Sequence, residues 1–528
     1  MWLLWIGGVL LVLIVLVAIY DLTQKKHAIL RNFPVLGHFR YLIETIGPEL
    51  RQYIVAANDE ERPFNRDERS WVYASSKKQN NYFGFGTDND VEGSPNYLVI
   101  NHNTFPIVSP HPESPEYDPM YQIPCAKIMG GHRQRAKAFR PSSVVNVSGM
   151  SFGSLSAPAV EALNLGCHKA GCMQSTGEGA ISPYHKKGGE LVWQIGTGYY
   201  GCRTLDGQFS LEKLKENLAA SPTVRALEVK LSQGAKPGAG GILPKSKITA
   251  EIAKIRGIPM DKDCVSPASH TSFSDADSLL DYVEMLATET GLPVGIKSAV
   301  GQIPFWQELA TLIDTTDRAP DFITIDGGEG GTGAAPLAFS DHVAKPFKLG
   351  FASVQKVFQE QGIAEKIVWC GSGKLGSPES ALFAFALGCD IVNVARAAML
   401  AIGCIQAQKC HTNHCPTGVA TQNKWLVRGL DPTSKADRCA NYLVALRKEI
   451  LLLCRACGVP HPGMMTAEHL EIVNDRYGSQ TVGQIFGYTS EYGLPSKIDR
   501  DAVEKLICLL YTSPSPRDRT RSRMPSSA

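Results

Sequence analysis

The sequence has almost no net charge and little cysteine. Its 53 Lys and Arg nearly balance 51 Asp and Glu, which leaves a formal charge of +2. With 44% hydrophobic residues, this balance argues against a disordered chain and against nucleic-acid binding through bulk charge. The 14 Cys in 528 residues are too few for a disulfide scaffold and are typical of a reducing compartment. The 49 Gly and 32 Pro follow no three-residue period, which excludes a collagen-like structure.

An uncharged run opens the chain. From Trp2 to Tyr20 there are 19 consecutive residues without a charge, close to the ~20 that a helix needs to cross a bilayer. The run has neither the basic start nor the small-residue cleavage pattern of a signal peptide. Basic residues follow the run and none precedes it: Lys25, Lys26, Arg31 and Arg40. The positive-inside rule therefore predicts a single-pass inner-membrane protein with a cytoplasmic catalytic domain, the alternatives being a cleaved signal peptide or a buried core helix.

Eight short strand-like runs recur through the middle of the chain, each ending in a Gly-rich or polar loop. They begin at Val144, Cys172, Leu191, Arg225, Leu292, Asp321, Lys366 and Asp390. Most are separated by helix-patterned stretches, which indicates βα alternation and a parallel sheet. Eight units in roughly 250 residues predict an α/β fold of the TIM (β/α)8 barrel type. A doubly wound open sheet is the alternative, but no strand–GxGxxG–helix opening supports it.

Residues that follow barrel strands point into the active site at the C-terminal face. This places a set of polar residues around one mouth: Ser151, Ser154, Glu178, Gln233, Lys236, Lys297, Asp326, Glu329, Ser372, Lys374 and Arg396. Taken singly, each could be a solvated loop residue. GSGK from Gly371 and the Arg396 loop follow the seventh and eighth units, where barrels commonly bind the phosphate of a ligand. Lys297 lies in a strand-like run, where a cation can stabilise the negative charge of a reduced flavin; a surface lysine is the alternative.

Three cysteines stand close together after the eighth unit. Cys404, Cys410 and Cys415 have the spacing C-x5-C-x4-C, and Pro416 follows. Three thiolates followed by a proline are suited to an iron–sulfur cluster. A Cys3His zinc site that uses His411 or His414 is the competing interpretation, and three inert buried cysteines are a third.

Five motifs resemble the FMN-binding barrel of glutamate synthase, in the same order. They are SGMSFGSLS from Ser148, STGEGA from Ser175, QGAKPGAGG from Gln233, GGEGGTGAAP from Gly327 and GCIQAQKCHTNHCPTGVATQ from Gly403. The cysteine spacing equals that of the 3Fe–4S ligands of the family, and the N-terminal part resembles a shorter, membrane-anchored branch of it. The resemblance covers about residues 140 to 425.

The resemblance implies an oxidoreductase that acts on CH–NH2 donors. Bound FMN would take electrons from the cluster on Cys404, Cys410 and Cys415 and reduce 2-iminoglutarate, formed from 2-oxoglutarate and ammonia, to L-glutamate. Met150, Ser151 and Glu178 would lie near the flavin, Lys297 would stabilise its reduced form, and Gly371, Ser372, Gly373 and Arg396 would hold the phosphate. Lys236 would hold the 2-oxoglutarate carboxylate, and Glu329 would lie near the substrate.

The sequence departs from the family pattern at two positions. The motif KPGEGGQLP of the family reads KPGAGGILP here, so Ala239 and Ile242 replace a Glu and a substrate-contacting Gln. An apolar Ile cannot donate a hydrogen bond to a carboxylate, which leaves the substrate open. We see no amidotransferase domain and no dinucleotide-binding motif, so the nitrogen source and the electron donor are expected to be separate partners.

These observations predict five segments. They are a transmembrane anchor (1–22), an N-terminal helical or irregular extension (23–140), the barrel with its iron–sulfur loop (141–425), a C-terminal helical extension (426–508) and a disordered, non-native tail (509–528). A basic interaction tail is the alternative for the last segment. Two other functions remain open: an FMN enzyme for another amino or imino acid, and a membrane electron-transfer or redox flavoprotein.

Overall fold

The computed structural model describes residues 2–24, 27–114, 117–475, 477–489 and 492–512. Contacts divide the chain into two compact units, residues 1–67 and 68–528, which are described separately. The last residues of the predicted tail, 513–528, lie outside the described residues. The four before them belong to the final helix, α17 (Lys497–Thr512), so the expectation of disorder from residue 509 is not met at these four positions.

The first unit consists of helices in sequence: α1 (Trp2–Thr23), α2 (Ala28–Asn32), α3 (Leu36–Leu50) and a π-helical turn, η1 (Arg51–Val55). Within α1, Leu4–Thr23 is long and apolar enough to cross a bilayer, and 6% of that stretch is buried. A buried core helix would be mostly covered by protein, so this alternative from the sequence is disfavoured. The buried carboxylate of Asp21 accepts hydrogen bonds from the Val35 N–H (2.8 Å) and the His38 ring (2.9 Å), which ties the end of α1 to the start of α3.

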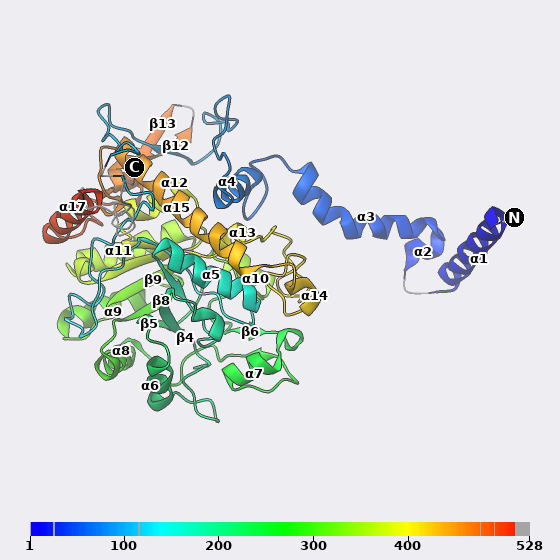
Figure 1. Cartoon of the computed structure of the whole chain (residues 1–528), viewed down its shortest axis with the longest axis horizontal. Helices are drawn as coiled ribbons and strands as arrows, with labels where there is room; N and C mark the ends of the chain where they lie inside the picture. The colour runs from blue at the N-terminus through cyan, green and yellow to red at the C-terminus, as the bar shows by residue number, and fades with distance from the viewer. Residues whose placement is uncertain (1, 25–26, 115–116, 476, 490–491, 513–528) are drawn as a thin grey trace, which may run out of the picture. The chain divides into compact units, whose positions relative to one another are not determined.

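The second unit is built around a closed barrel of eight strands (Figure 1). Its strands are β2 (Val145–Val147), β3 (Met173–Ser175), β4 (Glu190–Ile195), β5 (Val224–Lys230), β8 (Val294–Ser298), β9 (Phe322–Asp326), β10 (Val368–Ser372) and β11 (Ile391–Val394). Every neighbouring pair is parallel, and β11 closes on β2 with Val392 opposite Val145. All eight predicted strand units are therefore confirmed, as is the TIM-barrel class.

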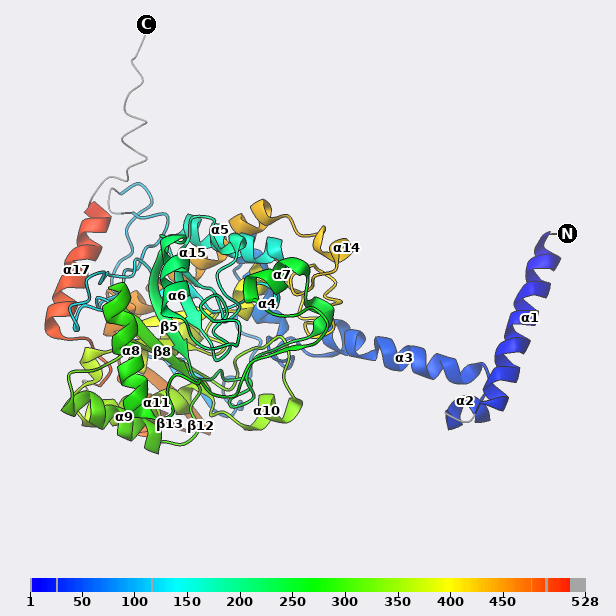
Figure 2. The ribbon, with the colours of Figure 1, turned by 90° about the horizontal axis from the view of Figure 1, so that it is seen from below.

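Helices alternate with the strands and cover the barrel, as Figures 1 and 2 show. They are α5 (Ala157–Ala170), α6 (Leu211–Ala219), α7 (Ala250–Arg256), α8 (Ala276–Thr290), α9 (Pro304–Thr315), α10 (Leu337–His342), α11 (Phe347–Glu360), α12 (Pro378–Ala386) and α13 (Arg396–Ala401). Their ends follow sequence signals. Ser156 and Asp275 accept hydrogen bonds from the first turns of α5 and α8, and Gly171 and Gly291 end these helices with a left-handed conformation.

Additional segments surround the barrel. Before it come α4 (Arg66–Ser76) and β1 (Tyr97–Ile100), and within it β6 (Ile242–Leu243) pairs with β7 (Cys264–Val265). After it come α14 (Lys424–Val427), α15 (Pro432–Ala456), β12 (Leu470–Asp475), β13 (Gly478–Thr481) and α16 (Val482–Phe486). β12 pairs with both β1 and β13, so segments from the two ends of the unit form one small sheet.

Helix α15 packs closely on α5. A Cβ added to Gly166 of α5 would lie 2.5 Å from the Cβ of Cys439, so only glycine permits this approach. Arg447 of α15 is fully buried at the same contact. Its guanidinium donates to the carbonyl oxygens of Met120 and Ala170, both at 2.9 Å. The second of these bonds gives a donor to a carbonyl at the C-terminal end of α5.

We expect Arg447→Ala to lower the free energy of unfolding by roughly 3 kcal/mol, because it removes the hydrogen bonds of the guanidinium to Met120, Ala170 and Ser143 and opens a cavity. The change is measured as a shift of the thermal or urea midpoint. Asp437→Ala on the same helix is the matched control, because the Asp437 pair with Lys169 is exposed and should contribute no more than about 1 kcal/mol. Equal effects of the two changes would contradict the assigned role of Arg447.

Candidate functional site

Parallel closure brings the carboxyl ends of all eight strands to one end of the barrel. The residues predicted for the mouth lie at these ends or in the segments that follow them. They are Met150, Ser151 and Ser154 after β2, Glu178 after β3, Gln233 and Lys236 after β5, Lys297 in β8, Asp326 in β9, Glu329 after β9, Gly371 and Ser372 in β10, Gly373 and Lys374 after β10, and Arg396 at the start of α13. The topology therefore gathers every one of them at the same face.

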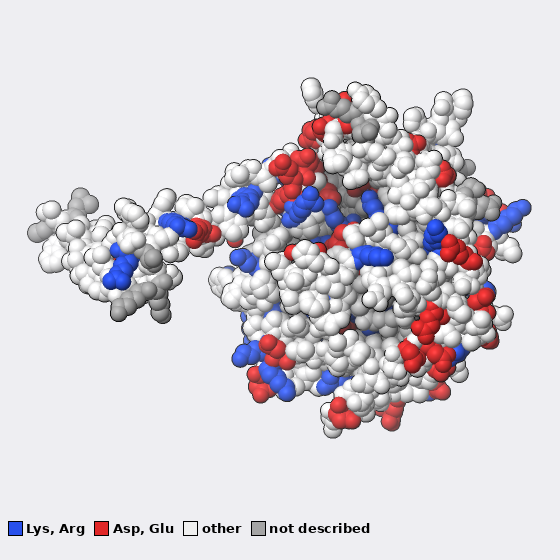
Figure 3. All heavy atoms as spheres, turned by 180° about the vertical axis from the view of Figure 1, so that it is seen from behind, with Lys and Arg blue, Asp and Glu red and all other residues white. Residues whose placement is uncertain are grey.

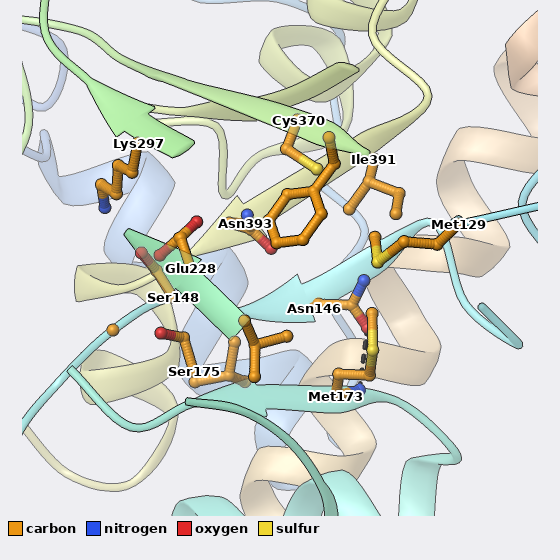
Figure 4. Close-up of a pocket in the computed structure, with 14 residues that line it drawn as sticks. Met129, Asn146, Ser148, Met173, Ser175, Glu228, Lys297, Cys370, Ile391 and Asn393 are labelled. Carbon is orange, nitrogen blue, oxygen red and sulfur yellow. Dashed lines mark hydrogen bonds between the residues drawn. The ribbon is translucent and has the colours of Figure 1, made fainter. Parts of the chain in front are cut away.

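A cavity lies inside the barrel (Figure 4). It is lined by residues from all eight strands, and Met129 lines it together with them. Much of the lining is polar: Asn146, Ser148, Ser175, Glu228, Lys297 and Asn393. The buried hydroxyl of Ser175 has no hydrogen-bond partner in the described part of the chain. A buried polar atom without a partner beside a cavity is suited to a polar ligand group such as the edge of a flavin ring.

Lys297 projects from β8 into this cavity, as Figure 4 shows. Its side chain is 7% exposed, and its Nζ lies 3.5 Å from the Asp326 carboxylate. Burial by itself lowers the pKa of Lys297, but the nearby carboxylates of Asp326 and Glu228 outweigh it and raise the pKa. The lysine is therefore a buried cation at neutral pH, as the prediction of a charge-stabilising role requires.

A second group of charges lies at the mouth beyond β5. Lys230 forms an ion pair with Glu178 at 3.1 Å, and the lysines at positions 230 and 236 together lower the pKa of Glu178 against the effect of its burial. Lys236 is 5% exposed, and its Nζ donates to the carbonyl oxygen of Ala334 at 2.9 Å. Burial lowers the pKa of Lys236 to about 8. Lys236 makes no salt bridge within the described ranges, so it has a positive charge available for an anion.

The turn after β10 has the features of a phosphate cradle. Gly373 has a φ of 126°, which favours glycine, and a Cβ there would lie 3.0 Å from the backbone nitrogen of Gly327. The guanidinium of Arg396 is held over the neighbouring loop by a hydrogen bond to the carbonyl oxygen of Glu329. A glycine turn beside a guanidinium is suited to the chemistry of a phosphate. The residues present therefore fit the phosphate of FMN.

Glu329 takes a structural position in this loop. Its Oε2 accepts a hydrogen bond from the backbone N–H of Phe347 at 2.8 Å, at the first residue of α11. The carboxylate thus holds the loop after β9 against the start of a helix. A direct role of Glu329 at a substrate stays a prediction.

The three cysteines lie on a loop that follows α13. Burial raises the pKa of the Cys404 thiol to about 12, and Cys410 and Cys415 contribute to the same rise because they lie near it. The backbone N–H of Gln406 points to the Cys404 sulfur at 3.4 Å, and the Cys415 sulfur lies 3.6 Å from the Thr417 hydroxyl. Hydrogen bonds of this kind to sulfur are typical of iron–sulfur sites.

The described residues contain no group of three His, Cys, Asp or Glu side chains that converge closely enough to hold a single metal ion. A preformed Cys3His zinc site is therefore not observed among them. A cluster with several iron atoms makes a different demand, because each thiolate binds its own iron and the sulfurs stand farther apart. The electrostatic interactions among Cys404, Cys410 and Cys415 show that the three cysteines lie near one another.

The cysteine loop packs against the barrel mouth. The side-chain amide of Gln422 donates to the carbonyl oxygens of Gly153 (3.2 Å) and Leu155 (2.8 Å) in the segment after β2. Lys247 joins the two segments, because its Nζ donates to the carbonyl oxygens of Ser154 (2.5 Å) and Cys410 (3.3 Å). A group bound by the cysteines would thus be adjacent to the mouth.

Sequence reasoning missed Lys247 and Glu228. Lys247 is 2% exposed, yet it lies in a polar stretch, KSKITAEIAKIR, that carries no signal of burial. Glu228 could have been found, because it is a charge within the apolar strand run RALEVKL, the same signal that identified Lys297. Its carboxylate accepts hydrogen bonds from Gln194 (2.6 Å) and Thr324 (2.7 Å) inside the barrel.

The two positions that depart from the expected motif lie near this mouth. Ile242 begins the short strand β6, where it stands opposite Val265 of β7. A Cβ added to the preceding Gly241 would lie 2.4 Å from a carboxylate oxygen of Glu178, so the ribbon approaches the Glu178–Lys230 pair closely. The residue that replaces a hydrogen-bonding Gln therefore directly follows the backbone position that approaches the charged pair.

Figure 3 shows basic and acidic residues interspersed over the visible face of the second unit. No patch of one sign stands out on that face, in agreement with the balanced composition. The cationic side chains that matter for the site are instead Lys236, Lys247, Lys297 and Arg396, which lie at the mouth.

Residues 124–460 match the family model described as the conserved region in glutamate synthase, which is more than half of the chain. The chain is 37% identical to the glutamate synthase large subunit-like protein YerD of Bacillus subtilis, over 88% of this chain and 94% of that protein. It is 36% identical to the archaeal glutamate synthase [NADPH] of Methanocaldococcus jannaschii, over 60% of this chain and 59% of that protein. The chain thus matches nearly the whole of the first relative and a little over half of the second.

Among solved structures, a flavocytochrome b2 mutant with pyruvate bound is 14% identical, with a TM-score of 0.42, over 90% of this chain and 92% of that one. This likeness is too distant to support any statement about the site.

Proposed function

The chain belongs to the glutamate synthase family and is an oxidoreductase of that type, and from this we propose that it uses FMN and an iron–sulfur cluster to reduce 2-iminoglutarate to L-glutamate. The observation that carries the proposal is the contact of the cysteine loop with the barrel mouth through Lys247 and Gln422. This contact brings a candidate electron-transfer group beside a candidate flavin site, as an oxidoreductase with both groups requires.

FMN, when bound, supplies hydride transfer to the imine carbon. The residues of the chain would position it from three sides. Gly371, Ser372, Gly373 and Arg396 would bind the phosphate, and Met150 and Ser151 would lie beside the ring. Lys297, a buried cation at the end of the cavity, would stabilise negative charge on the ring system.

Cys404, Cys410 and Cys415 would ligate the cluster, which we propose to be of the 3Fe–4S type because the chain offers three cysteines in this loop. The neighbouring ammonium of Lys247 and guanidinium of Arg396 would offset the charge of the thiolates, since both lie within electrostatic range of the loop. A separate protein would supply the electrons, and a separate amidotransferase is the proposed source of ammonia.

Lys236 would bind a carboxylate of the 2-oxo acid, because it is a cation at the mouth without a salt-bridge partner in the described residues. Glu178 is already paired with Lys230, so it would orient that lysine and leave Lys236 for the substrate. Membrane attachment through α1, with the barrel on the cytoplasmic side, belongs to the same proposal.

One observation favours a second candidate, an enzyme for another 2-oxo or imino acid. Ile242 presents an apolar side chain where the family motif has a hydrogen-bonding Gln, so the pocket would accept a less polar chain end. The two candidates share the chemistry and differ in the side chain of the substrate.

The direct test is anaerobic. The chemically reduced protein is mixed with 2-oxoglutarate and ammonium, and flavin reoxidation is followed by its visible absorbance while glutamate is assayed. We expect reoxidation with one glutamate formed per flavin. Reoxidation only with a less polar 2-oxo acid would favour the second candidate, and a flavin that stays reduced with every 2-oxo acid would refute both.

The cluster assignment has its own test. Cys410→Ser should abolish the iron–sulfur signal in electron paramagnetic resonance and reduce the bound iron, because a hydroxyl is a poor substitute for a thiolate ligand. The matched control is Cys457→Ser, which changes a cysteine outside the loop and should leave the signal intact. An unchanged signal in Cys410→Ser would remove this cysteine from the ligand set.

Lys236 gives a prediction about pH. Its pKa is lowered to about 8, so it is charged below that pH and loses its charge above it. The KM for 2-oxoglutarate should therefore rise above pH 8, by up to about tenfold per pH unit. Lys236→Arg should flatten this rise because arginine stays charged, and Lys236→Ala should raise KM at every pH. The control Lys245→Ala changes an exposed lysine nearby. An unchanged KM in Lys236→Ala would exclude the lysine from substrate binding.

A further inference from the structure

Helix α3 (Leu36–Leu50) and the turn after it carry an exposed apolar stripe. Its members are Leu36, Phe39, Ile43, Ile46, Leu50 and Ile54, which recur every three or four residues. At 100° per residue these positions fall within about one third of the helix circumference. All six are exposed, from 38% for Leu50 to 77% for Leu36. A contiguous apolar stripe of this length is seldom left in contact with water.

Leu42 is also exposed beside the stripe, and the opposite side of the helix is polar. Arg40 and Glu44 form an exposed ion pair along one side at 2.8 Å, and Thr45 is exposed on the side opposite the stripe. The helix is thus apolar on one face and charged on the other. Fifteen residues span about 22 Å, which is too short to cross a hydrocarbon core of about 30 Å, and the charges would oppose such a crossing.

The position of α3 next to α1 indicates what covers the stripe. The buried Asp21 carboxylate at the end of α1 accepts hydrogen bonds from Val35 and His38 in the first turn of α3. The start of α3 is therefore fixed where the candidate span ends, at the depth of the lipid headgroups. The sequence also places Lys25, Lys26 and Arg31 between the two helices, and basic residues at this depth attract anionic lipid.

We propose that α3 lies in the plane of the membrane interface, with its apolar stripe inserted among the acyl chains of a bilayer that contains anionic lipid. Amphipathic helices of this composition bind at the boundary between headgroups and acyl chains. The inference rests on the membrane attachment through α1 proposed above. A second attachment point would limit the rotation of the chain about a single span, because two linked helices at different angles fix an orientation that one helix leaves free.

The test uses the full chain in vesicles of phosphatidylcholine and phosphatidylglycerol. The photo-crosslinking residue p-benzoylphenylalanine replaces either Phe39 or Ile46 on the stripe, or Thr45 on the opposite face as the matched control. The bound flavin absorbance of each variant verifies that the barrel is folded. After illumination, mass spectrometry identifies the crosslinked partner. We expect phospholipid adducts at positions 39 and 46, several-fold more abundant than at position 45.

Three results would overturn the proposal: a crosslink to a second copy, a crosslink to residues 68–528 of the same chain, or equal lipid labelling of both faces. An alkaline wash of the same vesicles separates this inference from the attachment through α1. A chain that withstands the wash without lipid adducts on the stripe retains the anchor and refutes the interfacial helix. A chain that is labelled by lipid before the wash but removed by it supports the interfacial helix and refutes the span.

Discussion

The pairing of β2 with β11 is the constraint on which the rest of the site depends. These strands are about 250 residues apart in the sequence, and their register sets Val394 opposite Val147. Because neighbouring parallel strands end side by side, the segment after β11 must lie next to the segment after β2. The cysteine loop follows β11 and α13, and the serine-rich loop follows β2, so closure brings them together. Hydrogen bonds then stabilise the contact between the two loops. They are the bond from Ser156 N–H to the Val419 carbonyl (2.9 Å) and those of Gln422 and Lys247.

Charge pairing at the mouth determines which cations remain for ligands. A buried ammonium is costly unless a carboxylate accompanies it, and Lys230 and Lys297 have such partners in Glu178 and Asp326. The Nζ of Lys236 donates instead to the carbonyl oxygen of Ala334. Burial of this ammonium without a carboxylate partner lowers the pKa of Lys236. A bound anion would offset the unfavourable free energy of burying this ammonium. Under the proposed function, this pattern would separate the cation that supports a cofactor, Lys297, from the cation that binds a substrate, Lys236.

The fold was predictable from the sequence because it depends on a repeated signal. Each barrel strand combines β-branched residues with a following glycine or polar loop. Because this signal occurs eight times, an error in the prediction of one strand does not change the predicted fold class. The mouth residues followed from the strand ends without further information. Lys247 could not be found in this way, since its burial results from contacts with segments that are 93 and 163 residues away in sequence. The helix-capping position of Glu329 was equally invisible, because α11 begins 18 residues further on.

The aromatic residues at the two ends of α1 are consistent with the proposal that α3 begins at the membrane interface. Exposed Trp2 and Trp5 stand at one end of the helix and exposed Tyr20 at the other. Aromatic residues prefer the two interfaces, and the 19 residues from Trp2 to Tyr20 span about 27 Å of helix, close to the thickness of the hydrocarbon core. Asp21 follows directly, where a carboxylate would be expensive in hydrocarbon and tolerable among headgroups. Because its carboxylate accepts hydrogen bonds from Val35 and His38, the first turn of α3 would lie at the same depth as Asp21. In the proposed membrane orientation, Asp21 would thus end the apolar span and set the level at which the amphipathic helix begins.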